Sequence, residues 1–526
     1  MLDRRNFMKT CSGMGLAGTL FPGVLWAQAQ EQGAAKITKQ MIDNAAAIAD
    51  VTIADEYKEM MLADLNEHAK GYEEIYKLKI PNSVDPAVVF DPVLPGMRFE
   101  TERKPMRISQ PPNVGGSAPK NLEDLAFASV RELAELVRTK KVSSVALTEM
   151  YLGRLKKYDP TLKFTVTLTE ERALAQAKKA DAEIATGKYR GPLHGLPWGA
   201  KDLLATKGYR TTWGAGGFEN QMIDEDATVV KRLDDAGAVL VAKLTLGALA
   251  LGDVWFGGVT RNPWNTHQGS SGSSAGPASA TAAGCVAFSI GSETLGSISS
   301  PSTRCGCTGL RPTFGLVPRT GAMALSWTMD KLGPICRSVE DCALVLDAIY
   351  GPDGHDRTVH AAAFQWDANL DWKKLRVGYL KTDFEYKPES PQAEAKEEPA
   401  KTPEEQKKRD EQRKRREAGR ARAEYDRKYN DAALAKLREM RVNLIPVELP
   451  KFPYSAITVM LTAESAAAFD DLTRSGRDKL LTSQKDYDWP NGFRAARFIP
   501  AVEYIQAARA RKLAMEAMAK VLDGVD

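Results

Sequence analysis

The sequence contains little histidine and little cysteine, and this scarcity excludes several kinds of site. Only five histidines and six cysteines occur among its 526 residues. Cys11 lies in an N-terminal stretch that we expect to be removed, and the odd number of cysteines left cannot form a complete disulfide framework. Cys305 and Cys307 are too close together for a zinc knuckle, and no histidine cluster accompanies them. We therefore predict small buried cysteines, no metal site and no cofactor.

The sequence also lacks a large excess of charge of either sign. Its formal net charge of +4 gives no electrostatic reason to expect a nucleic-acid or membrane-surface partner. One basic run, Lys407–Arg416, is interleaved with acidic residues and has no aromatic side chains that could stack on bases. Glu404 with Lys408, and Glu411 with Arg415, are spaced for i, i+4 pairs, so we interpret this run as a solvated surface helix.

The N-terminal apolar stretch is too short for a membrane span, and its flanks are typical of an export signal. Arg4-Arg5 precedes a weakly apolar stretch at 11–26, and Ala27-Gln28-Ala29 has the small-x-small pattern of a cleavage site. A spanning helix needs roughly 20 apolar residues. Residues 1–29 therefore resemble a twin-arginine signal peptide, which predicts a periplasmic or secreted protein with no stable membrane anchor. An uncleaved anchor is the alternative.

Composition along the rest of the chain indicates an α/β protein with additional segments. Residues 30–120 combine a helical stretch at 36–80 with a proline-rich extended one. Residues 121–526 carry the globular pattern, in which short apolar runs alternate with Gly, Ser and Pro clusters as buried strands and their loops do. Residues 385–430 form a charged insertion with too few large apolar residues to join a core.

A helix start is predicted at the beginning of the globular pattern. Ser129 followed by Glu132 is a capping box, and apolar residues at helical spacing come directly after it.

Three short segments rich in small residues carry the candidate chemistry. They are Gly195–Asp202, Gly269–Ala280 and Gly291–Ile298. Small residues allow the backbone to come close to a reacting group. Taken together and in this order, the segments resemble the amidase signature family, and the resemblance runs from about residue 125 to residue 526.

The resemblance implies a fold and a set of catalytic roles. The expected fold is a large mixed β-sheet covered by helices on both faces. Ser297 is the expected nucleophile, Ser273 the bridging hydroxyl and Lys201 the base. Two Ser-Ser pairs compete for the bridging role, and the spacing found in the family selects Ser273 over Ser270. The last six residues resemble the lead into a further strand, so we expect the natural protein to continue and this chain to be truncated.

The chemistry explains why these residue types are needed. A serine hydroxyl is a poor nucleophile until a base removes its proton. None of the five histidines lies in Gly291–Ile298, the segment that holds Ser297 and is called the nucleophile turn below. A lysine can be that base only as the neutral amine, so burial must lower its pKa by about three units from its usual value near 10.4. The backbone N–H groups of Thr294, Leu295, Gly296 and Ser297 are the candidates that face the oxyanion. Trp255 and Phe256 are candidates to line an acyl pocket, and core packing is the alternative for them.

The expected activity is hydrolysis of a carboxylic or peptide amide to an acid and ammonia or an amine, through an acyl-enzyme. Glu293, Leu295 and the pair Ser299-Ser300 depart from the usual family residues, which puts one anchoring contact in doubt but no catalytic atom. Two alternatives remain: a protein like the A subunit of the tRNA-dependent amidotransferase, and a non-catalytic binding protein on an amidase scaffold. The export signal argues against the first alternative, and the intact catalytic residues argue against the second.

Replacement of Arg4 and Arg5 by lysine tests the predicted export route. Because twin-arginine recognition depends on the arginine pair, we expect the double variant to remain in the cytoplasm with its first 29 residues attached. Cell fractionation followed by N-terminal sequencing measures both effects. Undiminished export of the double variant would contradict the prediction.

Overall fold

The computed structural model describes residues 37–49, 51–84, 86–110, 112–114, 119–385, 402–485 and 487–526. The predicted signal segment at 1–29 and part of the predicted insertion lie outside the described residues, so the signal stays a prediction. The chain divides into two compact units. One consists of Met1–Val84 with Phe498–Pro500, and the other holds the rest.

The smaller unit contains two helices in its described part, α3 (Lys39–Ile48) and α4 (Asp55–Lys77). The hydroxyl of Thr38 accepts a hydrogen bond from the N–H of Met41, which caps the first turn of α3. The helical prediction for 36–80 is confirmed over these two spans, with a break between them.

The larger unit is built on a six-stranded mixed sheet. Its strand order is β1-β3-β2-β8-β10-β9. The three central strands β3, β2 and β8 are parallel to one another, and the outer pairings are antiparallel. The strand bounds are β1 Thr165–Leu168, β2 Pro197–Lys201, β3 Val239–Leu244, β8 Phe288–Glu293, β9 Thr308–Gly309 and β10 Lys331–Cys336. Every residue of β2, β3 and β8 is buried, which accords with the continuous apolar run at the start of β3.

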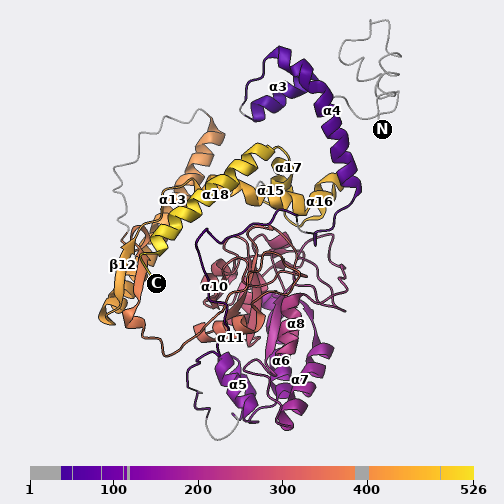
Figure 1. Ribbon diagram of the computed structural model, residues 1–526. Helices are drawn as coiled ribbons and strands as arrows, with labels where there is room; N and C mark the ends of the chain where they lie inside the picture. Colours follow the sequence, from indigo (N-terminus) through magenta and orange to yellow (C-terminus); the bar gives the residue numbers. More distant parts are fainter. Residues whose placement is uncertain are drawn as a thin grey trace. The chain divides into compact units, whose positions relative to one another are not determined.

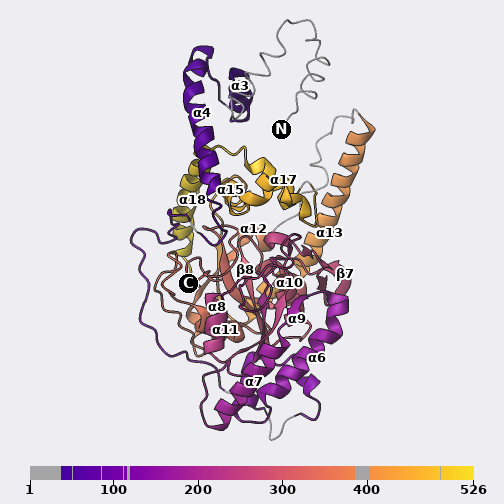
Figure 2. The ribbon, with the colours of Figure 1, turned by 90° about the vertical axis from the view of Figure 1, so that its right-hand side faces the viewer.

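Helices pack against this sheet. Helices α6, α7, α9 and α11 contact its strands directly, and Figures 1 and 2 show α6 and α7 side by side. The predicted α/β fold with a large mixed sheet is confirmed. The helix bounds in this part are α5 Val130–Arg138, α6 Ser144–Leu162, α7 Glu170–Ala185, α8 Thr228–Asp235, α9 Ala275–Ala282, α10 Ser299–Cys305 and α11 Val339–Ile349.

The core between sheet and helices follows from the sequence pattern. Leu155, Phe164, Val241 and Leu244 are fully buried in one cluster. The capping box predicted at the start of α5 is present, because the Ser129 hydroxyl and the Glu132 carboxylate each accept the other residue's backbone N–H. The capping box fixes the start of α5, which the spacing of apolar residues alone does not locate.

The C-terminal third adds a small parallel pair of strands and several helices. Strand β11 (Arg376–Leu380) pairs with β12 (Asn443–Val447). The remaining bounds are α12 Lys381–Phe384, α13 Pro403–Glu439, α14 Tyr454–Ile457, α15 Val459–Ala468, α16 Asp470–Ser475, α17 Trp489–Ala496 and α18 Ala501–Leu522. In the described part of the chain, no helix is both long and apolar enough to cross a bilayer.

The solvated helix predicted near residue 410 is present as α13, the long helix in Figure 2. Most of its described side chains are exposed, and Leu434, with 3% of its surface exposed, is the buried anchor near its C-terminal end. The described part of the charged segment therefore contributes little to a core before that residue.

Deletion of residues 386–424 tests this interpretation. We expect a replacement Gly-Ser linker of about twelve residues, spanning roughly 20 Å, to change the free energy of unfolding by less than about 1 kcal/mol. Leu434→Ala is the matched control, and loss of its buried methyl groups should cost about 2–5 kcal/mol. Urea unfolding measures both. A deletion as costly as the control would show that the charged segment packs on the fold.

Candidate active site

Lys201 is the last residue of β2 and lies fully buried beneath the Gly-rich loops. Its Nζ donates to the hydroxyls of Ser273 at 2.8 Å, Ser292 at 2.8 Å and Ser274 at 3.0 Å, and lies 3.3 Å from the Ser292 carbonyl oxygen. The ammonium is therefore surrounded by neutral oxygen atoms. Burial lowers the pKa of Lys201 well below its ordinary value, although the negative charges of Asp330 and Glu293 oppose this shift.

The loop that carries Ser273 is held close to neighbouring backbone. A Cβ at Gly272 would lie 1.8 Å from the carbonyl oxygen of Gly252, so only glycine fits there. The Gly272–Ser273 peptide bond is cis. Ser274 follows immediately, and its hydroxyl bonds both the backbone N–H of Ser292, at 3.1 Å, and the Ser292 carbonyl, at 3.0 Å. The loop is thereby tied to the end of β8.

Ser297 lies in the turn between β8 and α10. Its carbonyl oxygen accepts a hydrogen bond of 3.0 Å from the N–H of Ser274. Since Ser274 adjoins Ser273, this bond holds the nucleophile turn against the loop that contacts Lys201. Gly296 has φ of +87°, in the left-handed region that favours glycine. Lys201 thus bonds Ser273, and the turn that holds Ser297 is bonded to the next residue of the same loop, whereas the hydroxyl of Ser270 donates to the Ser271 carbonyl at 2.8 Å instead.

Glu293 anchors the far side of the nucleophile turn. Its Oε2 accepts from the N–H groups of Ile298 and Ser299, both at 2.9 Å, at the start of α10. Burial would raise the pKa of Glu293, but the hydrogen bonds from this helix start outweigh burial and hold it below its ordinary value. Arg311 adds an ion pair of 3.5 Å to the other carboxylate oxygen. Glu293 therefore anchors the turn to the start of α10.

Asp330 anchors the near side of the turn. The Thr294 hydroxyl donates to Asp330 Oδ1 at 2.6 Å, and the N–H groups of Leu325 and Ser326 donate to Oδ2 at 2.8 and 2.9 Å. Burial raises the pKa of this carboxyl above its ordinary value. Asp330 lies outside the three sequence motifs, and those motifs do not distinguish Ser274 and Ser292, whose hydroxyls bond Lys201, from other small residues.

The predicted oxyanion donors lie between these two anchors. Among the described residues, no acceptor takes the backbone N–H of Leu295 or Ser297. The N–H of Gly296 lies near the Glu293 carboxylate and helps to lower the pKa of that group. The Leu295 side chain is 66% exposed, so a leucine in place of the usual glycine meets no steric conflict. The N–H of Thr294 likewise has no acceptor among the described residues, so three of the four predicted donors are left unbonded there.

Trp255 and Phe256 lie at a hairpin beside the Gly-rich loop. Strand β4 (Val254–Trp255) pairs with β5 (Gly258–Val259), and the two rings meet edge to face with centroids 4.7 Å apart. Trp255 is buried, which accords with the core-packing alternative, and the pocket role stays a prediction. The hairpin is fixed to the loop because Asp253 Oδ2 accepts from the N–H of Ser271 at 2.9 Å.

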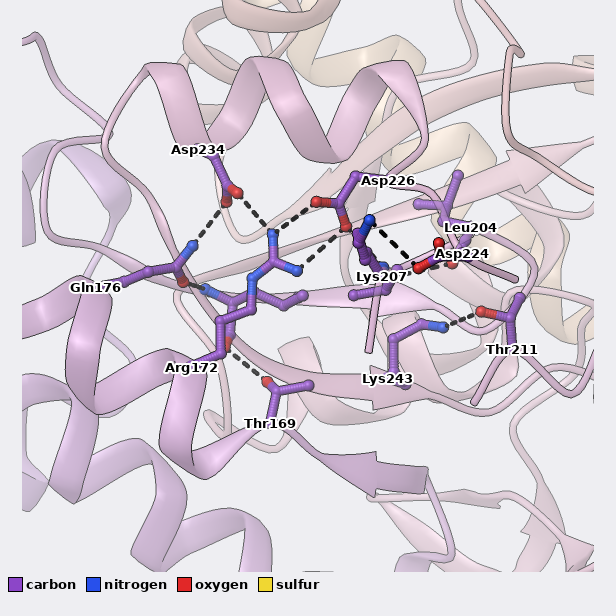
Figure 3. Close-up of polar contacts among 12 residues, drawn as sticks. Thr169, Arg172, Gln176, Leu204, Lys207, Thr211, Asp224, Asp226, Asp234 and Lys243 are labelled. Carbon is purple, nitrogen blue, oxygen red and sulfur yellow. Dashed lines mark hydrogen bonds and ion pairs between the residues drawn. The ribbon is translucent and has the colours of Figure 1, made fainter. Parts of the chain in front are cut away.

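A second buried lysine lies on the neighbouring strand. Lys243 Nζ and Asp202 Oδ1 are 2.8 Å apart, and both side chains are fully buried. Asp202 Oδ2 also accepts from the Thr212 N–H at 2.8 Å, while Lys243 donates to the Thr211 hydroxyl at 3.0 Å (Figure 3). These contacts fix the loop that leaves β2 directly after Lys201.

The same loop is held farther along by a charged network. The guanidinium of Arg172 on α7 bonds Asp226 at 3.1 Å and Asp234 on α8 at 2.6 Å, as Figure 3 shows. Asp226 also accepts from the backbone N–H of Lys207 at 2.9 Å. The network joins α7 and α8 to the chain following Lys201 and has a structural function.

The candidate site is built from serine hydroxyls, one buried amine and backbone N–H groups. In the parts of the chain that the structure describes, no group of His, Cys, Asp or Glu residues could hold a metal ion. The five described cysteines carry no disulfide, and four of them are buried.

Comparisons with known proteins agree with this geometry. A family model described as Amidase matches residues 146–411. The A subunit of the glutamyl-tRNA(Gln) amidotransferase of Acinetobacter baumannii is 41% identical over 270 residues, covering 50% of this chain and 55% of the relative. The corresponding protein of Methylococcus capsulatus is 42% identical over 262 residues, covering 49% and 54%. The chain spans about half the length of the curated relatives it matches.

A solved structure extends the similarity beyond that region. The native peptide amidase from Stenotrophomonas maltophilia is 28% identical and superposes with a TM-score of 0.60, covering 76% of this chain and 82% of that one.

Lys243→Met tests the importance of the buried ion pair. Removal of the ammonium leaves the Asp202 carboxylate buried without its counter-ion, which should cost about 3–5 kcal/mol of unfolding free energy in urea at pH 7. The double variant Lys243→Met with Asp202→Asn removes the stranded charge and should recover more than half of that loss. A single variant as stable as the wild type would show that the pair contributes nothing.

Proposed function

Because the chain belongs to the amidase family, we propose that it hydrolyses a carboxylic or peptide amide through an acyl-enzyme on Ser297. The observation that carries this proposal is the buried Lys201 amine, 2.8 Å from the Ser273 hydroxyl in a loop bonded to Ser297. The likeness to a peptide amidase supports including peptide amides among the substrates.

In the acylation step the neutral Lys201 amine acts as the base. Ser273 passes its proton to Lys201 Nζ and takes the proton of Ser297, whose Oγ forms a bond to the substrate carbonyl carbon. The carbonyl oxygen becomes an oxyanion that the N–H groups of Leu295 and Ser297 face. Burial of Lys201 supports this assignment, because it favours the neutral form of the amine.

The second half of the step returns the proton. The Lys201 ammonium gives it back through Ser273 to the amide nitrogen, the carbon–nitrogen bond breaks, and ammonia or an amine leaves. A water molecule then attacks the acyl-enzyme with the same relay as base, which releases the carboxylic acid and restores Ser297. Asp330 and Glu293 stabilise the transient ammonium through space, since both oppose the lowering of its pKa.

A role like that of an amidotransferase subunit is the second candidate, and the 41% identity to such subunits favours it. Ammonia release by the isolated chain separates the two. Release equal to the amide consumed supports hydrolysis, whereas consumption that requires glutamyl-tRNA and further subunits supports transfer. Labelling of Ser297 by a fluorophosphonate separates either enzyme from a non-catalytic binding protein.

Single alanine substitutions in the proposed relay should lower the activity to different degrees, in a predictable order. Ser297→Ala removes the attacking atom and should abolish both amide hydrolysis and fluorophosphonate labelling. Lys201→Ala removes the base and should be nearly as severe for amides. Ser273→Ala leaves nucleophile and base in place and should cost roughly 10² to 10⁴ in kcat. Because the three groups act as a unit, combined substitutions should add little to the worst single one.

Ser270→Ala is the matched control for the loop. Its hydroxyl bonds only the next carbonyl in the described structure, so steady-state rates should be nearly unchanged. A crippled Ser270→Ala together with a fully active Ser273→Ala would show that the bridging serine has been misassigned.

A further inference from the structure

Lys331 begins β10 directly beside the end of β8, where its Cα is paired in register with that of Glu293. Its Nζ donates to the carbonyl oxygen of Thr294 at 3.1 Å and also to the carbonyl of Met329. The side chain therefore reaches from the neighbouring strand into the nucleophile turn, although it belongs to none of the three sequence motifs.

The effect of the hydrogen bond from Lys331 depends on its acceptor, the Thr294 carbonyl oxygen. The carbonyl of Thr294 and the N–H of Leu295 belong to the same planar peptide unit. A donor on the carbonyl oxygen fixes the direction in which the N–H points. It also polarises the peptide, because hydrogen bonds in a chain strengthen one another. We infer that Lys331 is a positioning residue that aims and strengthens the Leu295 N–H as an oxyanion donor, an inference that rests on the proposed acyl-enzyme function.

The surroundings of Lys331 carry charges of both signs. Asp330 adjoins it and Glu293 is its register partner on β8, while the charges of Arg311 and of Arg511 on α18 also act on it. Burial lowers the pKa of Lys331 to about 8, the two carboxylates oppose this shift and the two guanidiniums reinforce it. The group that holds the turn therefore changes charge near neutral pH.

This titration predicts the direction of a pH effect on rate. Below pH 8 the ammonium makes charge-assisted hydrogen bonds, which are roughly twice as strong as those of the neutral amine. The acylation rate should therefore fall as the pH rises through about 8. Lys201 has the opposite effect on the rate, because its neutral form is the active one. Its titration therefore sets the acidic limb of the pH–rate profile, and that of Lys331 sets the alkaline limb.

The contribution of Lys331 to the free energy of unfolding should change with pH in the direction opposite to the rate. The folded-state pKa of about 8 lies below the unfolded value of 10.5, so the unfolded chain binds more protons between these values. Lys331 therefore makes the fold more stable as the pH rises across that window. A rate that falls above pH 8 while stability rises cannot be explained by unfolding.

Lys331→Met and Lys331→Arg test the inference, with fluorophosphonate labelling of Ser297 and steady-state amide turnover as readouts. Lys331→Met should lower kcat and the labelling rate roughly 5- to 50-fold, less than the ~10²–10³ for losing an oxyanion donor outright. KM should stay within about threefold, because the effect is confined to the transition state. The limb near pH 8 should vanish.

Lys331→Arg keeps a cation that does not titrate in this range. It should restore kcat to within about fivefold of wild type and hold that rate above pH 9. Arg311→Met removes a nearby charge that pairs with Glu293 and makes no bond to the Thr294 carbonyl. Because Arg311 lowers the pKa of Lys331, its removal should move the alkaline limb to higher pH.

The outcomes separate this inference from the proposed function. A folded Lys331→Met variant with wild-type kcat and an unshifted alkaline limb would overturn the role of Lys331 alone. If Lys331→Met does not unfold cooperatively, the rate and limb of Lys331→Arg decide: an arginine variant that keeps the limb near pH 8 overturns the inference. Wild-type protein that neither turns over amides nor accepts the label would overturn both proposals.

Discussion

The buried amine of Lys201 is the interaction on which the rest of the site depends. Its hydrogen bonds go to three serine hydroxyls and one carbonyl, while Asp330 and Glu293 act on it only through space. A carboxylate in direct contact would favour the protonated form of a lysine, and a protonated lysine cannot accept a proton. The hydroxyl cage satisfies the amine in either charge state, so burial can lower its pKa without leaving it unbonded. The parallel register of β2 and β8 brings this cage together, because Lys201 ends one strand and Ser292 lies near the end of the other.

The second buried lysine shows what the alternative arrangement does. Lys243 contacts a carboxylate directly, and its partner Asp202 is the very next residue after Lys201. Asp202 lies in the turn that follows β2, and its contacts with Lys243 on β3 and with the Thr212 N–H direct this acid away from the Lys201 amine. One dipeptide therefore supplies a proton acceptor on one side and a structural ion pair on the other. The ion pair also fixes the chain just after Lys201, together with the Thr212 N–H that Asp202 accepts.

The parts of the site that lie within short motifs could be predicted from the sequence. The segments around Lys201, Ser273 and Ser297 predicted which residues converge, and the mixed sheet and the capping box at Ser129 were also foreseen. The cage residues Ser274 and Ser292 were within those motifs but could not be distinguished from other small residues without the bonds they make. Asp330 and Lys331 could not be found at all, because their relation to the turn depends on the antiparallel register of β8 with β10, which no local pattern encodes.

The nucleophile turn illustrates why such register matters for chemistry. Glu293 holds the N–H groups that follow the turn, while Asp330 and Lys331 hold the hydroxyl and carbonyl of Thr294 before it. A short loop held at both ends has little freedom to reorient, so its intervening N–H groups are preorganised before a substrate arrives. A leucine fits at 295 because its side chain is exposed, and the proposed mechanism uses only its backbone. Constraint on the turn thus comes from charged groups at its two ends, Glu293 at the end of β8 and Asp330 and Lys331 at the start of β10.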